Sequence, residues 1–155
     1  MITIIQRVSE AGVSVDGETV AKIGPGLLAL IAVEPGDTEA TAEKLVDRIL
    51  GYRVFDDGDG RMNLSVRDCK GEVLLVSQFT LAADTRKGLR PSFTTAADPE
   101  TGRRLFEHAV RHAQGAWPGR VAAGRFGAHM KVALVNDGPV TFWLRFTPSV
   151  ATESA

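Results

Sequence analysis

Two short polar segments follow strongly apolar runs of the chain, and each is a candidate for a binding or catalytic site. The first is Ser77-Gln78-Phe79-Thr80-Leu81, and the second is Asn136-Asp137-Gly138-Pro139-Val140-Thr141. Neither segment contains a nucleophile beside an obvious base. Small hydroxyls, one amide and a Gly-Pro step favour a site that works mainly through backbone groups and shape.

Ser77 suggests a serine hydrolase as a first alternative. The nucleophile elbow of such enzymes needs glycines two residues before and two residues after the serine, but Leu75 and Phe79 occupy these positions. A strand end offers another chemistry, because N–H groups beyond the last ladder bond lack partners and can face a ligand. We therefore predict that the amides of Phe79 and Thr80 stabilise an oxyanion. The simpler alternative is that the hydroxyls only cap the backbone.

The other titratable residues give weaker candidates, and they predict neither a metal nor a cofactor. His108 and His112 are four residues apart on an expected helix, but no acidic third ligand stands at a recognisable spacing. His129 has no serine or cysteine near it in sequence. Cys69 lies in a polar stretch and has no neighbouring histidine. The segment 56–60, which contains three aspartates, resembles a calcium loop but lacks its closing Glu, so we expect a solvated turn there.

The composition indicates one ordinary globular domain. The chain has 155 residues, of which 44% are hydrophobic and 24% are charged, and it contains a single cysteine. The N-terminus does not resemble a signal peptide, and no apolar run has the length of a membrane span, so we expect a cytoplasmic protein. A net charge of -1 argues against a general polyanion binder, although a small contact with one end of an RNA remains possible.

The hydrophobic pattern alternates between strand and helix periods. A hairpin is expected around Asp16-Gly17, because apolar residues alternate with polar ones on both sides. Capping residues and an apolar stripe predict a first helix from 38 to 50, and Asp98-Pro99 begins a second one. Strands are expected at 27–33, 52–55, 73–76, 130–135 and 140–146.

The end of the chain is predicted as two neighbouring strands with a tight turn at 136–139. Gly138-Pro139 by itself supports only this turn, because Gly-Pro is a common turn dipeptide. Residues 1–147 are expected to form the domain, and 148–155 a loose tail.

Several separate motifs resemble those of the D-aminoacyl-tRNA deacylases, in the same order and spacing. The resemblance extends from Met1 to about Arg145 and carries enough motifs in register to argue against chance. The motifs are Ser77-Gln78-Phe79-Thr80-Leu81, Lys87-Gly88, Arg90-Pro91-Ser92-Phe93, Gly124-Arg125-Phe126-Gly127-Ala128 and Asn136-Asp137-Gly138-Pro139-Val140-Thr141.

The resemblance implies a single-domain α/β homodimer with a barrel-like, mainly antiparallel β core and two main helices packed outside. In this family, the Ser-Gln-Phe-Thr segment of one subunit and the Gly-Pro segment of the other form one pocket. By resemblance, Gly138 and Pro139 are joined by a cis bond and exclude an L side chain, while a D side chain or glycine fits. Arg7 is then expected to hold this segment from across the interface.

The implied reaction is hydrolysis of the ester that joins a D-amino acid to the terminal ribose of tRNA, with glycyl-tRNA as a further substrate. The 2′-hydroxyl of the substrate is thought to assist in this family, and no cofactor or metal is implied. Ser77, Gln78, Phe79 and Thr80 are then expected to form the pocket wall and the oxyanion donors. The expected tRNA phosphate contacts are Arg86, Lys87, Arg90 and Arg125.

The chain departs from the family pattern after Leu81. Ala82 and Ala83 stand where an aromatic residue is common, which puts the local packing or the adenosine contact in doubt. Two other functional classes remain open beside the deacylase. One is a metal-free serine hydrolase of small esters that depends on Ser77, and the other is an RNA-binding relative that has the pocket but no catalysis.

Overall fold

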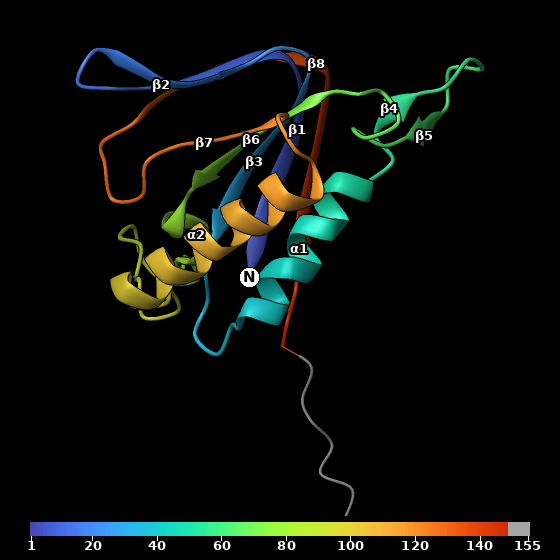
Figure 1. Ribbon diagram of the computed structural model, residues 1–155. Coiled ribbons are helices and arrows are strands. Elements are labelled where there is room, and N and C mark those ends of the chain that lie inside the picture. The colour runs from blue at the N-terminus through green and yellow to red at the C-terminus, as the bar shows by residue number, and fades with distance from the viewer. Residues whose placement is uncertain (149–155) are drawn as a thin grey trace, which may run out of the picture.

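A curled six-stranded sheet forms the centre of the fold in the computed structural model, which describes residues 1–148. Helices α1 (Glu39–Gly51) and α2 (Pro99–Ala116) lie side by side against one face of this sheet (Figure 1). The strands are β1 (Ile2–Val15), β2 (Glu18–Ile23), β3 (Gly26–Ala32), β6 (Glu72–Ser77), β7 (Val121–Ala123) and β8 (Lys131–Arg145), and β4 (Phe55–Asp56) and β5 (Met62–Leu64) form a separate hairpin.

The order of the strands confirms the predicted α/β class with a barrel-like, mainly antiparallel core. The sheet runs β2-β1-β3-β6-β7, and β8 pairs with β1. β1 is antiparallel to β2, β3 and β8, whereas β3, β6 and β7 are parallel to one another. The expected tail begins at Pro148, and its residues 149–155 lie outside the described part, so the domain boundary stays a prediction.

The predicted opening hairpin is confirmed. Asp16 and Gly17 have φ angles of 50° and 83°, which are the left-handed conformations that a tight hairpin turn needs. The turn joins β1 to β2, with Val15 paired to Glu18.

The two central strands are buried on both faces, as their continuous apolar runs predict. On β3, Leu27 and Ala29 belong to the core beneath the helices, whereas Leu28 belongs to a second core inside the curl of the sheet. On β6, Leu75 and Leu74 divide between the same two cores. Both strands are therefore fixed in place, and so is the strand end that carries Ser77.

The two predicted helices are confirmed, including their N-terminal signals. The Thr38 hydroxyl accepts a hydrogen bond from the Thr41 amide, and the Asp98 carboxylate accepts one from the Thr101 amide. Pro99 occupies the first turn of α2, where its missing N–H costs nothing. No helix in the described range, 1–148, is long and apolar enough to cross a membrane.

The turn predicted at 136–139 is wrong, because β8 is one continuous strand. It pairs antiparallel to β1 from Ile2 with Arg145 to Ser14 with Lys131. The long N-terminal strand offers partners over this whole length, so neither half of β8 needs the other as a neighbour. Figure 1 shows β8 as one long ribbon beside β1.

Two further differences concern short strands. The strand expected at 52–55 is only β4, Phe55–Asp56, because residues 52–54 lead from α1 without ladder pairing. The acidic turn that follows is confirmed as the loop between β4 and β5, with Asp57 accepting from the amides of Asp59 and Arg61. These contacts, the one from Arg61 first, lower the pKa of Asp57. β7 was not predicted, since three residues carry too little periodicity.

Candidate functional site

The Ser77 segment lies at the carboxyl end of β6 and turns at once into a short 3-10 helix, η1 (Phe79–Ala82). The Gln78 amide still donates to the Ile31 carbonyl, at 2.7 Å. Within the described residues, no acceptor is recorded for the next two amides, those of Phe79 and Thr80. The first N–H groups of such a helix have no partner inside it. The geometry therefore supplies two adjacent donors at the predicted place.

The side chains of this segment do not form a nucleophile and base pair. The Gln78 amide nitrogen donates to the Thr80 hydroxyl at 2.5 Å, which joins these two side chains. For Ser77, no hydrogen bond of the hydroxyl to a histidine or carboxylate is recorded anywhere in residues 1–148. Phe79 is 56% exposed, which is unusual for a phenylalanine and leaves its ring available to a ligand.

A cavity of about 250 Å³ opens directly beside Ser77 and Phe79. Its walls come from the ends of β3 and β6, the start of α2 and the segment after β7. A Cβ atom at Gly102 would lie 3.4 Å from the Phe126 ring, so the glycine keeps this end of the cavity open. The remaining apolar lining is Ile31, Val33, Ala97, Pro99 and Phe106.

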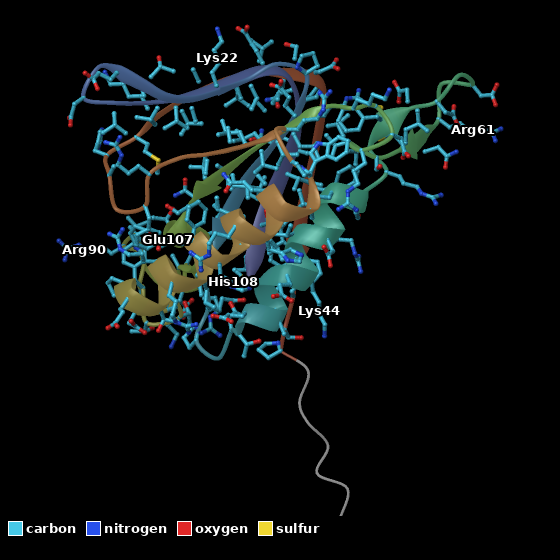
Figure 2. The ribbon with its side chains drawn as sticks, viewed as in Figure 1. Lys22, Lys44, Arg61, Arg90, Glu107 and His108 are labelled. Atoms are coloured by element: carbon cyan, nitrogen blue, oxygen red, sulfur yellow. The ribbon has the colours of Figure 1, made fainter. Side chains whose placement is uncertain are left out.

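Three of the four predicted tRNA-binding cations lie on the loop after η1. The loop is closed by two backbone hydrogen bonds between Asp84 and Ser92, of 2.7 and 3.0 Å. The ring of Phe93 stands 5.1 Å from the ring of Phe79, so the base of the loop contacts the Ser77 cavity. Arg86, Lys87 and Arg90 are exposed on this loop, and Figure 2 shows Arg90 pointing away from the body of the protein.

Arg86 is not a free cation in this loop. Its guanidinium donates to both carboxylate oxygens of Asp84, at 2.9 and 2.7 Å. The guanidinium and then the Arg86 amide lower the pKa of Asp84 to about 2. A phosphate would have to compete with this carboxylate for Arg86.

Arg125, the fourth predicted cation, lies on the segment between β7 and β8, and its side chain is exposed. The neighbouring Phe126 lines the Ser77 cavity. The four cations therefore form two groups near the cavity, one beside Phe93 and the other beside Phe126.

The second candidate segment is a bulge in β8. Gln6 pairs with Thr141 and Val8 pairs with Asn136, so a single residue of β1, Arg7, faces residues 137–140. The Gly138-Pro139 peptide bond is cis, and Gly138 has a φ of +134°. Both residues are exposed, and residues 137–140 leave the ladder with β1.

Arg7 holds the bulge, but it does so within one chain. Its Nε donates to the Asp137 carbonyl at 3.0 Å, and its Nη1 donates to the Val54 carbonyl at 2.8 Å. Asp56 and Asp137 add carboxylates at 3.6 Å each. The contact across an interface that the resemblance implies for Arg7 stays a prediction beside these contacts within the chain. Arg7 stands directly opposite the bulge in its own sheet, so its guanidinium reaches Asp137 without a second copy.

The two candidate segments do not share a pocket within one chain. β6, β3, β1 and β8 are successive neighbours, so three strand spacings of about 4.8 Å separate them. Ser77 pairs with Ile31 and Ile31 with Thr3, whereas the bulge faces Arg7, further along β1. At about 3.3 Å per residue, both offsets together give roughly 20 Å over the sheet.

The histidines on α2 face α1. His108 Nε2 lies 2.9 Å from Glu43 Oε1, and His112 Nε2 lies 3.0 Å from Asp47 Oδ1. Within residues 1–148, no group of three or more His, Cys, Asp or Glu side chains is arranged to hold a metal. Partial desolvation, followed by the Asp68 charge, raises the pKa of the Cys69 thiol.

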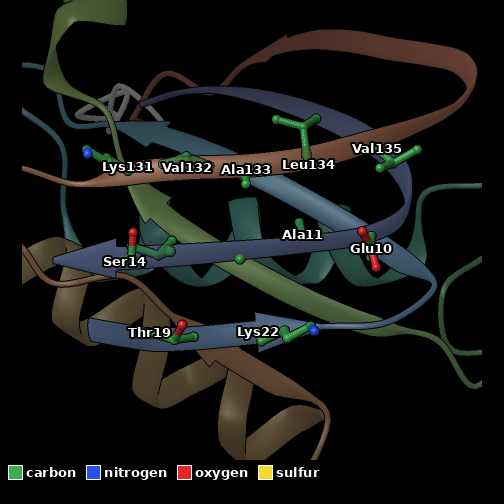
Figure 3. Close-up of a pocket in the computed structure, with 12 residues that line it drawn as sticks. Glu10, Ala11, Ser14, Thr19, Lys22, Lys131, Val132, Ala133, Leu134 and Val135 are labelled. Carbon is green, nitrogen blue, oxygen red and sulfur yellow. The ribbon is translucent and has the colours of Figure 1, made fainter. Parts of the chain in front are cut away.

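A wider hollow of about 540 Å³ lies along the exposed side of β8, β1 and β2 (Figure 3). Its charged lining is Glu10, Lys22 and Lys131, and the other side chains are small or aliphatic. It is lined by paired strands, so its backbone groups are largely used in ladders. The hollow beside Ser77 is therefore the better candidate for chemistry.

Sequence reasoning missed part of the cavity lining. Phe106 belongs to the buried face of α2, and Phe126 stands in a motif to which the sequence assigns no role. Both line the cavity, together with Gly102. A glycine in the first turns of an amphipathic helix, at the place where its apolar stripe begins, was the available signal.

A family model and the similar proteins of known sequence point to the same family. The chain matches the family model described as D-Tyr-tRNA(Tyr) deacylase over residues 4–145. A D-aminoacyl-tRNA deacylase of Thioalkalivibrio sulfidiphilus is 65% identical over 148 residues, which cover 96% of this chain and 99% of that protein. The protein of the same name from Cupriavidus metallidurans is 59% identical over 154 residues, with 96% and 98% covered.

Two solved structures share the fold. The c-Myc DNA unwinding element binding protein superposes with a TM-score of 0.90 at 37% identity, and the match covers 96% of this chain and all of that one. A probable eukaryotic D-amino acid tRNA deacylase superposes with a TM-score of 0.78 at 17% identity, with 92% and 97% covered.

Proposed function

Because the chain belongs to the D-Tyr-tRNA(Tyr) deacylase family, we propose that it hydrolyses the ester bond of D-aminoacyl-tRNA and rejects the L-aminoacyl form. The observation that supports this site most directly is the pair of unpartnered amides at Phe79 and Thr80 beside an apolar cavity. The products are free tRNA and a D-amino acid, so the activity is a chiral proofreading step of translation.

Hydrolysis of the ester needs hydrogen-bond donors for the oxyanion and a positioned water. When water or hydroxide adds to the ester carbonyl, negative charge develops on the carbonyl oxygen, and the Phe79 and Thr80 amides bind it. Removing one such donor from an enzyme costs about 2.7 to 4 kcal/mol. An ester is reactive enough for this stabilisation and a positioned water to suffice, with the substrate's 2′-hydroxyl assisting. Ser77 and Gln78 then shape the wall, and the cavity accepts an apolar group next to the ester.

The handedness test is assigned to Gly138 and Pro139 of a second subunit. The two segments lie roughly 20 Å apart over one sheet, which supports a site completed by a second copy of the chain. The bulge projects into solvent, and Val135 and Trp143 on either side of it are 50% and 57% exposed. Half-exposed apolar residues around a projecting segment fit a homodimer interface. In the dimer, the bulge of each copy would close the other copy's site.

The tRNA contacts are assigned to the two groups of cations beside the cavity. Lys87 and Arg90 are exposed on the loop next to Phe93, and Arg125 lies beside Phe126. Arg86 binds a phosphate only after the phosphate displaces Asp84. Only the acceptor end is held, which fits a protein with a net charge of -1. A tRNA substrate supports a cytoplasmic location.

Comparing one amino acid in its two chiral forms tests the proposal. D-tyrosyl-tRNA and L-tyrosyl-tRNA are incubated with the protein, and loss of the ester is followed over time, with glycyl-tRNA as a third substrate. We expect rapid loss of the D ester, slow loss of the glycyl ester and no loss of the L ester above the spontaneous rate. Equal rates on D and L, or no hydrolysis, would refute the proposed function.

Ser77→Ala separates this mechanism from a serine hydrolase. Because the Ser77 hydroxyl has no base beside it in the described structure, we expect the variant to keep the D-tyrosyl-tRNA rate within roughly tenfold, whereas losing a true nucleophile costs on the order of 10⁶-fold. Single-turnover kinetics measure this difference. A loss of several orders of magnitude with the fold intact would favour the serine hydrolase instead.

A further inference from the structure

A groove between α2 and the segment after β7 carries three arginines, of which only Arg125 has an assigned tRNA contact. Arg103 and Arg111 come from α2, and Arg125 comes from the segment after β7; together they line an open hollow of about 330 Å³. We propose that this groove holds the sugar-phosphate backbone of the tRNA acceptor strand next to its terminal nucleotide. The inference rests on the proposed function and adds the direction in which the RNA leaves the site.

The groove is continuous with the catalytic cavity. Phe106 and Phe126 line both hollows, so the two adjoin at these rings. The guanidinium of Arg103 lies 4.9 Å above the Phe126 ring, at the boundary between them. A strand whose terminal ribose ester faces Phe79 and Thr80 can therefore continue into the groove without crossing the body of the protein.

The spacing of the arginines suits a chain of phosphates. Arg103 and Arg111 are two turns apart on α2, which places their backbones about 12 Å apart along the helix. Successive phosphates of one strand rise by about 3.4 Å in a DNA duplex, which sets the order of magnitude for an RNA strand. The helix therefore offers cations over a length of several nucleotides, and Arg125 faces them from the opposite wall of the groove.

The charge of the groove favours an anion over a protein partner. Three guanidiniums face one carboxylate, that of Glu107, which lies 3.6 Å from Arg103. In the described part of the chain, no ion pair is recorded for Arg111 or Arg125. On the other side of the cavity, the loop after η1 offers fewer free cations, because Arg86 is bound to Asp84 there. We therefore assign contact with the terminal nucleotide to that loop and contact with the preceding backbone to the groove. Ala123 and Gly124 also line the groove, and their small or absent side chains leave room for a backbone to approach.

Arg111→Gln tests the proposal, with Arg61→Gln as the matched control. Both variants remove one exposed positive charge, and Figure 2 shows Arg61 on the β4–β5 hairpin, at the end of the molecule opposite Arg90. Each protein is assayed on D-tyrosyl-tRNA and on the D-tyrosyl ester of adenosine, which lacks the acceptor strand. KM and kcat are measured over a series of salt concentrations.

We expect Arg111→Gln to raise KM for D-tyrosyl-tRNA by roughly three- to tenfold and to reduce the slope of log KM against log salt by about 0.7 to 0.9, the value of one phosphate contact. The adenosine ester should be hydrolysed at the wild-type rate, and Arg61→Gln should match the wild type on both substrates. Glu107→Gln should lower KM for the tRNA by roughly two- to fivefold, because it removes an exposed carboxylate from the groove.

The outcomes separate this inference from the proposed function. An active wild type with an unchanged KM and salt slope in Arg111→Gln would overturn the groove alone. An equal loss on the adenosine ester would also overturn it, because the residue would then act on the catalytic cavity. A wild type that hydrolyses neither ester would overturn the proposed function, and the groove with it.

Discussion

Replacing Asp37 with Asn is expected to lower the free energy of unfolding by about 3 kcal/mol, the lower end of the range for breaking a buried ion pair. The Asp37 side chain is 1% exposed, and its two oxygens lie 2.8 and 2.7 Å from the amino group of Met1. One of these oxygens also accepts a hydrogen bond from the Glu34 amide, at 2.7 Å. Asparagine keeps the shape but leaves the buried ammonium of Met1 without its nearest charge.

The surroundings of Met1 determine how much stability Asp37→Asn loses. Met1 is fully buried, and its ammonium also donates to the Phe146 carbonyl at 2.7 Å, so water cannot replace the lost carboxylate. Glu34 lies 3.3 Å from the same ammonium and compensates part of the charge. The pair ties β1, the start of α1 and the end of β8 together, so its loss should affect the whole fold.

Urea unfolding at a fixed protein concentration measures the change, because the stability of an oligomer depends on concentration. The control is Asp47→Asn, which removes a carboxylate that pairs with His112 but is 62% exposed. An exposed pair of this kind is worth at most about 1 kcal/mol. If the free energies of unfolding of Asp37→Asn and Asp47→Asn differ by less than about 1 kcal/mol, the buried pair does not stabilise the fold.

The regular elements could be predicted from the sequence because their signals are local. Thr38 and Asp98 cap helices whose apolar stripes are plain in the sequence, and Asp16-Gly17 marks a hairpin turn. β3 and β6 are apolar on both faces, which only a covered central strand allows. These signals fix the α/β class and place Ser77 at a strand end.

The continuity of β8 could not be predicted, because it depends on a partner far away in sequence. A Gly-Pro step between two alternating runs is the usual pattern of a hairpin turn. It becomes a bulge here since β1 is long enough to pair with both runs, and Arg7 donates a hydrogen bond to the Asp137 carbonyl, which leaves the ladder. The register of β1 with β8 decides this outcome, and neither segment contains that information alone.

The candidate site also has a part that the sequence predicts and a part that only the fold brings together. The segments of Ser77 and of Gly138 are identified by their composition and by resemblance to a family, and the unpartnered amides follow from the strand end. The cavity wall does not follow, because Gly102, Phe106 and Phe126 come together only when α2 packs over the segment after β7. Similarly, Arg86 is a cation in the sequence but an ion pair with Asp84 in the fold.

Gly138→Ala is expected to reduce the ratio of D to L hydrolysis by roughly 10²-fold, the loss that a misplacement of about 1 Å can cause. A Cβ atom at Gly138 would lie 2.8 Å from a methyl group of Val140 and 2.9 Å from its amide nitrogen. The φ of +134° is also unfavourable for alanine. Both effects move the Gly138 and Pro139 carbonyls, which the proposed function places against the chiral centre of the substrate.

The control is Gly60→Ala, at another glycine with a positive φ, +73°, in the turn between β4 and β5. No atom lies within 4 Å of a Cβ placed there, so the variant places alanine at a positive φ without the contact. The D and L rates of both variants are measured on tyrosyl-tRNA. We expect Gly60→Ala to keep the wild-type ratio.

The direction of the change identifies the role of the bulge. A filter that works by excluding the L side chain fails by admitting it, so the L rate should rise in Gly138→Ala while the D rate changes less. A segment that only joins two subunits would instead lower both rates together, and their ratio would stay that of the wild type. An unchanged ratio would therefore remove Gly138 and Pro139 from the handedness test, even if the site is still formed by two copies of the chain.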